Sequence, residues 1–178
     1  MAIKITYFVH GTTTDNERRL STGQAPGKLS KLGIKQSIEL KEQIKDKEFD
    51  VIFSSDLKRA VDSVNLSFDD MDIPKLQDKR LRECDYGDLT GTEEVDYINY
   101  IDKKFPNGES MKDVEKRIKE FLDFLKENYD GKRIAIMAHK ASQLAIEVII
   151  NKKTWEQAIE EDWRKTKEWK PGWEYILK

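Results

Sequence analysis

The chain contains only two histidines, and each lies where an apolar, strand-like run ends. His10 follows the run 3–9 and precedes Gly11, and His139 follows the run 133–138. One histidine after a strand is usually an ordinary surface or core residue, so the argument depends on the pair. In an open α/β sheet, ligands bind in the crevice outside the carboxyl ends of the strands. We therefore expect both imidazoles to face one ligand site.

Two charged residues complete this candidate site. Arg59 falls in the first turn of a helix predicted after the strand 49–54, where the helix terminus and the guanidinium would face the same anion. Glu83 lies on an irregular stretch, where a carboxylic acid can be shielded enough to hold a proton at neutral pH. Each has an ordinary alternative. Arg59 could be a solvated helix residue, and Glu83 could form a surface ion pair with Arg80 or Arg82.

The order of these signals resembles the histidine phosphatase superfamily, also called the phosphoglycerate mutase-like family. The segments that carry the resemblance are Val9-His10-Gly11, Ser54–Ala60, Leu81-Arg82-Glu83, Met137-Ala138-His139, Leu29–Gly33 and Asn107–Ser110. Each segment alone is a weak signal, but together they follow one another at sensible spacing over nearly the whole chain. The resemblance implies a three-layer α/β sandwich with a mainly parallel central sheet and helices on both faces.

The resemblance also implies an activity, that of a metal-independent phosphomonoester hydrolase working through a phosphohistidine. In such a mechanism His10 attacks phosphorus in line. Arg59 and His139 hold the phosphoryl oxygens and stabilise charge in the transition state. Glu83 gives a proton to the leaving oxygen and then accepts one from the attacking water. The implied catalytic residues are therefore His10, Glu83, His139 and Arg59.

The same resemblance assigns substrate contacts to Asn16, Thr22 and Gly23, and implies a small-molecule phosphomonoester as the partner. The implied scheme uses no cofactor and no metal, and two histidines cannot by themselves supply a usual zinc site. Two alternatives stay open at this point. One is a phosphoglycerate-type mutase with the same chemistry, and the other is a catalytically weakened, regulatory protein that binds a phosphate ligand.

The chain departs from the family at one position of the motif. The family sequence is Arg-His-Gly, and here Val9 replaces the arginine. Loss of one preorganised charged donor can lower a rate by roughly 10²–10³-fold. We expect Lys140 to supply the missing charge and bind substrate, because it directly follows the second histidine. Arg18, Arg19 and Lys28 are weaker candidates on the nearby loop. Without a replacement, only a binding or regulatory role would remain.

The elements needed to position these residues follow from the apolar periodicity. Strands are expected over 3–9, 49–54 and 132–138, and helices are expected to begin near Ser30, Asp56, Ser110 and Ala141. This alternation predicts βαβ units and a mainly parallel sheet, in a single domain spanning residues 1–178. Asp56 is expected to cap its helix. The helix after Ser30 is expected to turn Ile34, Ile38 and Ile44 toward the core.

Composition excludes several classes of protein. The 178 residues carry 32 basic and 34 acidic side chains, and the net charge of −2 gives no reason to expect a nucleic acid or an anionic membrane surface as partner. A single cysteine, Cys84, excludes an intramolecular disulfide. No secretory signal is present, and no apolar run approaches the roughly 18–20 residues of a membrane helix. We therefore expect a cytoplasmic protein.

The end of the chain is rich in aromatic and basic residues. All four tryptophans lie after Thr154, at positions 155, 163, 169 and 173, among arginines and lysines. One interpretation is a C-terminal helix and strand whose aromatic rings pack on the sheet. The other is an aromatic and basic lid near the mouth of the site, or a self-association surface that would make a homodimer.

Overall fold

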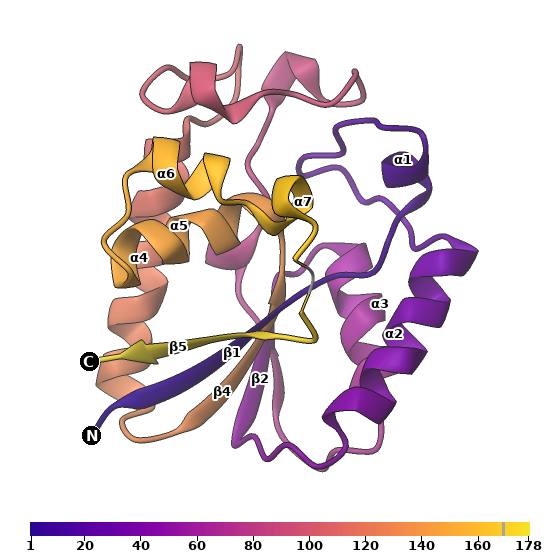
Figure 1. Cartoon of the computed structure of the whole chain (residues 1–178), viewed down its shortest axis with the longest axis vertical. Coiled ribbons are helices and arrows are strands. Elements are labelled where there is room, and N and C mark those ends of the chain that lie inside the picture. Colours follow the sequence, from indigo (N-terminus) through magenta and orange to yellow (C-terminus); the bar gives the residue numbers. More distant parts are fainter. Residues whose placement is uncertain (169) are drawn as a thin grey trace.

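In the computed structural model of the chain, which describes residues 1–168 and 170–178, five strands form one sheet (Figure 1). They are β1 (Ile3–Val9), β2 (Val51–Ser54), β3 (Lys75–Gln77), β4 (Arg133–Ala138) and β5 (Trp173–Leu177). Their order across the sheet is β3-β2-β4-β1-β5. The first four are mutually parallel, and β5 pairs antiparallel with β1 at the edge. The predicted, mainly parallel sheet is confirmed.

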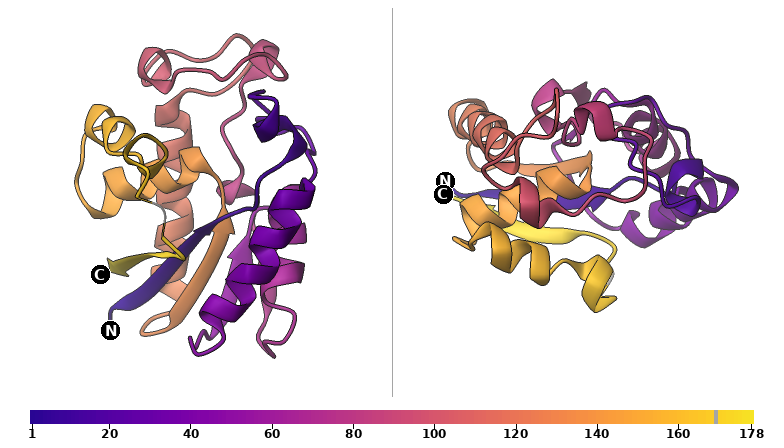
Figure 2. Two further views of the ribbon diagram at one scale, coloured as in Figure 1. Left: turned by 45° about the vertical axis from the view of Figure 1, so that its right-hand side comes forward. Right: turned by 90° about the horizontal axis from the view of Figure 1, so that it is seen from above.

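Helices cover both faces of this sheet (Figure 2). On one side lie α2 (Lys31–Ile44) and α3 (Lys58–Ser67), and on the other lie α4 (Met111–Asn128) and α5 (Lys140–Ile150). Shorter pieces complete the chain: α1 (Thr14–Glu17), α6 (Trp155–Glu160), α7 (Trp163–Thr166) and the 3-10 helices η1 (Lys79–Leu81), η2 (Gly87–Leu89) and η3 (Tyr97–Tyr100). The structure is therefore a three-layer α/β sandwich, as expected.

The core divides into two parts, one on each face of the sheet. Successive side chains of a strand point to opposite faces, so an internal strand of a covered sheet must be apolar on both. In β1, Ile5 and Tyr7 pack with residues of α4 and α5, such as Phe121. Phe8 packs in the other core, with residues of α2 and α3 such as Ile44. This alternation explains why β1 is almost continuously apolar.

Two of the predicted helix starts are confirmed by their caps. The Ser30 hydroxyl accepts a hydrogen bond from Gly33 N–H at the start of α2, and Ser110 caps α4 in a capping box. The prediction that Asp56 caps α3 is wrong. Leu57 is the N-cap residue, without a side-chain cap, and the Asp56 carboxylate instead accepts two hydrogen bonds of 2.7 Å from Arg82.

The expected buried face of α2 is also wrong in part. Ile44 is buried, but Ile34 and Ile38 are 41% and 50% exposed. The helix instead turns its small residues inward, including Gly33 and Ser37. The reason is a close backbone approach: a Cβ on Gly33 would lie 1.9 Å from the carbonyl oxygen of Thr12. A larger side chain on this face would push α2 away from the loop that follows β1.

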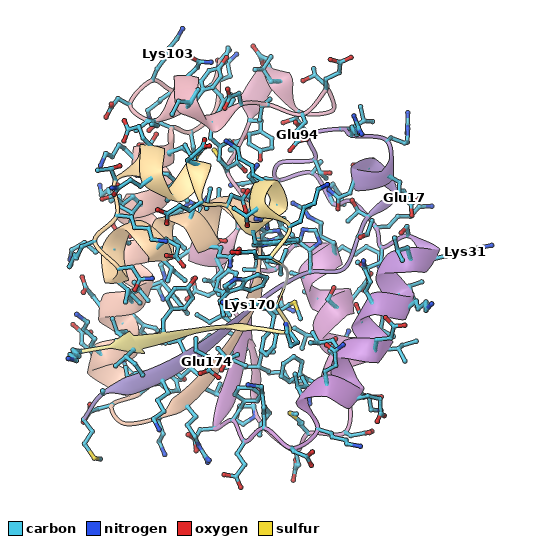
Figure 3. The ribbon with its side chains drawn as sticks, viewed as in Figure 1. Glu17, Lys31, Glu94, Lys103, Lys170 and Glu174 are labelled. Carbon is cyan, nitrogen blue, oxygen red and sulfur yellow. The ribbon has the colours of Figure 1, made fainter. Side chains whose placement is uncertain are left out.

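Charged side chains cover the outside of the sandwich. Figure 3 shows residues such as Lys31 and Lys103 pointing away from the ribbon. In the part of the chain that the structure describes, every helix is too short or too polar to cross a bilayer. The cytoplasmic location stays a prediction.

The C-terminal segment forms helices and a strand that pack against the rest of the fold. Trp155 is buried in the core beside α4 and α5, and Trp163 stacks on Trp173 with ring centroids 5.5 Å apart. Trp173 begins β5 and lies opposite Tyr7 of β1. The fourth tryptophan, at position 169, lies outside the described residues. The segment thus has the expected helix and strand, and it also reaches the carboxyl end of β1.

Gly33→Ala tests whether contact between α2 and the loop after β1 positions that loop. In an exposed helix interior, alanine would add about 0.5–1 kcal/mol of stability over glycine. Here we expect a net loss of about 1–3 kcal/mol in the free energy of unfolding, because the added methyl group overlaps Thr12 O. Chemical denaturation measures the change, with Lys31→Ala at an exposed position of the same helix as the control. A gain of stability would contradict the close contact.

Candidate active site

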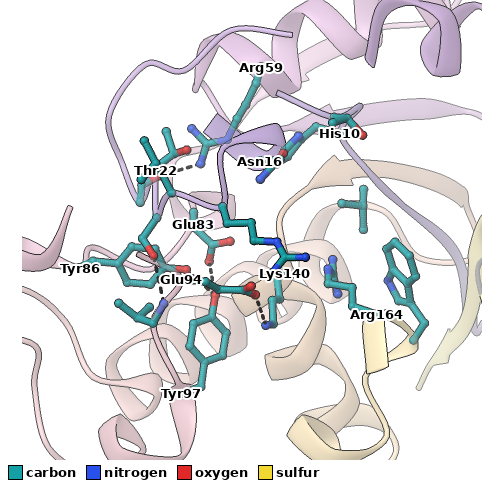
Figure 4. A pocket seen from close by; sticks show the side chains of 18 residues that line it. His10, Asn16, Thr22, Arg59, Glu83, Tyr86, Glu94, Tyr97, Lys140 and Arg164 are labelled. Carbon is teal, nitrogen blue, oxygen red and sulfur yellow. Dashed lines mark hydrogen bonds and ion pairs between the residues drawn. The ribbon is translucent and has the colours of Figure 1, made fainter. Parts of the chain in front are cut away.

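A pocket of about 340 Å³ lies at the carboxyl ends of β1 and β4 (Figure 4). Seven of the residues singled out in the sequence line it: His10, Asn16, Thr22, Gly23, Arg59, Glu83 and Lys140. The eighth, His139, is fully buried and lies against His10. The structure therefore brings together residues from five separate stretches of the chain.

The register of two neighbouring strands places the histidines together. β1 and β4 are adjacent and parallel, and Val9 pairs with Ala138. His10 and His139 are the next residues on each strand, so their rings leave the sheet at the same level. The ring centroids are 5.1 Å apart.

The His10 ring has a defined tautomer. Its Nδ1 lies 2.7 Å from the carbonyl oxygen of Gly11. A carbonyl oxygen only accepts, so Nδ1 carries the hydrogen and the lone pair is on Nε2. Burial, and after it the nearby positive charge of Arg59, lower the pKa of His10 from 6.5 to about 3. His10 is therefore a neutral imidazole with a free electron pair at physiological pH.

His139 is held from several sides. Its Nε2 lies 2.6 Å from the hydroxyl of Ser55, which follows β2. The phenol of Tyr7 donates to the carbonyl oxygen of His139 and accepts from its N–H, at 2.7 and 3.0 Å. Burial holds the pKa of His139 well below its usual value, and the charge of Arg59 acts in the same direction. The second imidazole is therefore also neutral and is fixed in orientation. Tyr7 and Ser55 were not predicted from the sequence.

Arg59 both lines the pocket and holds one of its walls. It is the second residue of α3, as the sequence predicts, and it is 2% exposed. Its guanidinium donates to the carbonyl oxygens of Gly23 and Ala25, at 2.6 and 2.9 Å. A guanidinium has five N–H donors, so further donors remain for an anion in the pocket. The solvated-helix alternative for Arg59 is excluded by its burial.

The loop that Arg59 holds carries the predicted substrate contacts. Thr22 donates its hydroxyl hydrogen to Asp15, at 2.9 Å. The Asn16 side-chain oxygen accepts from Thr13 N–H in the capping box of α1. This bond orients the Asn16 amide so that its NH₂ group is the part available to a ligand. Figure 4 shows Asn16 close to His10.

Glu83 is buried beside the pocket and does not form a surface ion pair. It is 7% exposed. Its Oε1 accepts hydrogen bonds from Cys84 N–H and from Ala141 N–H, at 2.8 and 3.1 Å, and from the phenol of Tyr97 at 3.3 Å. These partners all bind Oε1, so Oε2 is the oxygen available for exchange of a proton with a ligand. The neighbouring Arg80 and Arg82 pair with other carboxylates.

Arg117 of α4 fixes the loop that carries Glu83, and the sequence analysis missed it. Its Nη1 donates to the carbonyl oxygens of Arg80 and Arg82, at 2.6 and 2.7 Å, and its Nη2 donates to that of Glu83 at 3.0 Å. The Glu109 carboxylate pairs with the same guanidinium, at 2.8 Å from Nε. Glu109 belongs to the Asn-Gly-Glu-Ser segment. That motif therefore contains a residue that helps Arg117 hold the loop of Glu83 in place.

A second group of charges lies on the opposite wall from Arg59, around the predicted Lys140, whose charged partners were not singled out in the sequence. Lys140 Nζ lies 3.8 Å from Glu94 and 3.6 Å from Asp162, and 4.7 Å from the centroid of the Tyr97 ring. Arg164 of α7 pairs with the same Asp162 at 2.6 Å. Trp163 and Arg164 line the pocket, so the aromatic and basic C-terminal segment forms part of its wall.

Over residues 1–168 and 170–178, no three His, Cys, Asp or Glu side chains are grouped so that they could hold a metal ion. The single cysteine, Cys84, is buried, and burial raises the pKa of its thiol. What the pocket offers is two neutral imidazoles, one buried carboxylate and several fixed cations. Such a set favours a bound anion.

The fold is phosphoglycerate mutase-like, as its similarity to solved structures of phosphatases and of a phosphoglycerate mutase shows. The sequence profile of the histidine phosphatase superfamily (branch 1) matches residues 7–158, and the chain belongs to that superfamily. Its relatives carry the names of phosphatases and of mutases.

Three relatives illustrate this range. The chain is 30% identical over 134 residues to the uncharacterized phosphatase PhoE of Bacillus subtilis (strain 168), covering 75% of this chain and 69% of that protein. It is 27% identical over 169 residues to a 2,3-bisphosphoglycerate-dependent phosphoglycerate mutase of Allorhizobium ampelinum, covering 84% and 80%. The solved structure of a mycobacterial glucosyl-3-phosphoglycerate phosphatase superposes with a TM-score of 0.78 at 22% identity, over 90% and 84% of the two chains.

The low pKa of His10 predicts how stability depends on pH. The unfolded chain takes up a proton near pH 6.5, and the folded protein does so only near pH 3, so stability falls as pH decreases below 6.5. Between pH 7 and 5 we expect His10 to account for a loss of up to about 2 kcal/mol. Most carboxylates stay ionised in this window.

Replacement of His10 by asparagine should make this pH dependence shallower. Urea unfolding of the wild type and of His10→Asn at pH 7, 6 and 5 measures the difference. Lys31→Ala, at an exposed position, should keep the wild-type slope. An equal slope in wild type and His10→Asn would show that His10 titrates normally in the folded protein.

Proposed function

We propose that this protein is a metal-independent phosphomonoester hydrolase that works through a phosphohistidine on His10. The observation that carries the proposal is the hydrogen bond from His10 Nδ1 to Gly11 O, which leaves the Nε2 electron pair free in a basic pocket. A neutral imidazole with a fixed tautomer is a ready nucleophile toward phosphorus. Membership of the superfamily and the relatives named as phosphatases support the same chemistry.

The charge and the size of the pocket favour a small phosphomonoester. Among the described residues that line it, Arg19, Arg59, Lys140 and Arg164 outnumber the carboxylates Glu83 and Glu94. Both histidines are neutral and add no charge of their own. The net positive lining suits a phosphate dianion. A volume of about 340 Å³ falls in the range of small-molecule sites.

The reaction proceeds in two displacements. In the first, His10 Nε2 attacks phosphorus, the N–P bond forms and the P–O bond to the leaving group breaks. Glu83 gives a proton to the departing oxygen. In the second, Glu83 accepts a proton from water as the water oxygen attacks phosphorus, the N–P bond breaks and inorganic phosphate leaves. Arg59 and His139 stabilise the charge that gathers on the phosphoryl oxygens.

Three further residues have supporting roles in this proposal. The Asn16 NH₂ group donates to a phosphoryl oxygen. Thr22 and Gly23 form the wall that Arg59 holds in place and contact the rest of the substrate. Lys140 binds the substrate from the opposite wall. Residues 1–178 act as one domain, since β1 and β5 pair along one edge of a single sheet.

A phosphohistidine is directly detectable. After mixing with p-nitrophenyl phosphate, we expect base-stable, acid-labile phosphate on the peptide that contains His10, together with release of inorganic phosphate. His10→Asn should lose the covalent phosphate and turnover. Glu83→Gln should slow turnover by about 10²–10⁴-fold, since it removes the group that accepts a proton from the attacking water. Rapid quenching at alkaline pH followed by peptide mass spectrometry measures the intermediate.

The same experiment separates the alternatives. Lys31→Ala, at an exposed position that does not line the pocket, serves as the control and should behave as the wild type. A rearranged phosphate ester in place of inorganic phosphate, with a phosphoglycerate as substrate, would identify a mutase. Binding of phosphate without either product would favour the regulatory alternative. Full turnover by His10→Asn would overturn the proposal.

A further inference from the structure

The C-terminal segment brings a further guanidinium into the pocket, across from Arg59. Arg164 lines the pocket, and its Nη1 donates to Asp162 at 2.6 Å. Its Nη2 is buried and has no hydrogen-bond partner among the described residues. Buried donors in folded proteins are almost always satisfied, so an unpartnered one in a pocket points to a ligand. Figure 4 shows Arg164 beside Lys140, on the wall opposite Arg59 and Thr22.

A chain of contacts fixes Arg164 at the end of β1. Trp173 of β5 pairs with Tyr7 of β1, two residues before Val9. The ring of Trp163 stacks on that of Trp173, and the Arg164 guanidinium lies 4.5 Å from the centroid of the Trp163 ring. The arginine is therefore anchored through two aromatic rings to the strand that ends in the proposed nucleophile. Val9 lines the same pocket.

Among the charged groups of this wall, Arg164 keeps a hydrogen-bond donor for an anion. Asp162 is buried, with its side chain 1% exposed, and it is shared by Arg164 and Lys140. Glu94 also pairs with Lys140, so two carboxylates face the two cations of this wall. Lys140 has Glu94 and the Tyr97 ring as additional partners, whereas Arg164 keeps Nη2 free. Of the two cations, Arg164 is thus the one with an unused donor, and its positive charge also contributes to the low pKa of His10.

We propose that Arg164 binds the phosphoryl group opposite Arg59, so that the C-terminal segment supplies the charge that Val9 lacks. The inference deepens the proposed function, because it names the second cation of the same site. Arg164 and Arg59 would donate to different oxygens of one tetrahedral anion, with the two imidazoles between them. Lys140 then binds the substrate farther from phosphorus.

A reciprocal exchange between positions 9 and 164 tests this arrangement. The readout is the affinity for orthovanadate and for inorganic phosphate, measured by calorimetry, because neither anion carries a leaving group. Arg164→Ala should weaken both by about tenfold or more. Lys165→Ala, the exposed neighbour that pairs with Glu160, is the matched control and should bind as the wild type.

The second half of the exchange introduces arginine at position 9. Val9→Arg should restore anion affinity in the Arg164→Ala protein, because its guanidinium enters the space that Arg164 vacates. In the wild type, Val9→Arg should weaken binding, since two guanidinium groups then compete for one place. Arg164→Gln, which can still donate to Asp162 but has no charge, provides the test if the alanine variant does not fold.

The outcomes separate this inference from the proposed function. Equal affinities in Arg164→Ala and Lys165→Ala would overturn the role of Arg164, and so would the same effect of Val9→Arg in both backgrounds. Anion affinity is measured without turnover. An absent phosphohistidine in the wild type would therefore refute the hydrolase proposal while the loss of binding in Arg164→Ala still supported the anion site.

Discussion

The register between β1 and β4 is the constraint on which the site depends. Pairing of Val9 with Ala138 makes His10 and His139 the next residues on adjacent parallel strands. A shift of one residue would turn the second ring to the other face of the sheet, because side chains alternate along a strand. The apolar residues of both strands, buried in two separate cores, prevent that shift.

Burial then gives these rings their chemistry. Both imidazoles are neutral because the surrounding protein disfavours their charged forms, and the charge of Arg59 adds to that effect. Because the rings are neutral, they do not repel the cations that line the pocket. These cations therefore remain available to bind an anion. Arg117, through its bonds to three carbonyl oxygens, holds Glu83 within reach of this space. The proposed nucleophile, the proposed acid and the cations are thus held by separate elements of the fold.

Local signals in the sequence were sufficient for most of the framework. Apolar runs located β1, β2 and β4, and serine caps located the starts of α2 and α4. Prediction failed where a distant segment decided the outcome. Ile34 and Ile38 fit a helical stripe, but close contact of Gly33 with the loop after β1 turns them outward. Asp56 has the right position for a cap, and an arginine from a later loop binds it instead.

The charged wall of the pocket also depends on distant segments, which local sequence signals do not predict. Arg164 lies far from Val9 in sequence, and its place depends on the pairing of β5 with β1 and on two stacked tryptophans. No local pattern encodes that arrangement. Lys140 was predicted because it adjoins His139. Its pairing with Asp162, which Arg164 shares, depends on the folded chain and could not be predicted from the sequence. Proximity along the sequence therefore identified Lys140 next to His139, and the tertiary structure identified the charged residues around it.

The central claim is that one anion meets two neutral imidazoles, and ¹⁵N NMR of histidine-labelled protein tests it directly because the chain has only two histidines. At pH 6 both rings should be neutral, with the His10 hydrogen on Nδ1, and orthovanadate should shift the resonances of both. A protonated ring at that pH, the His10 hydrogen on Nε2, or a response from one ring alone would contradict the account.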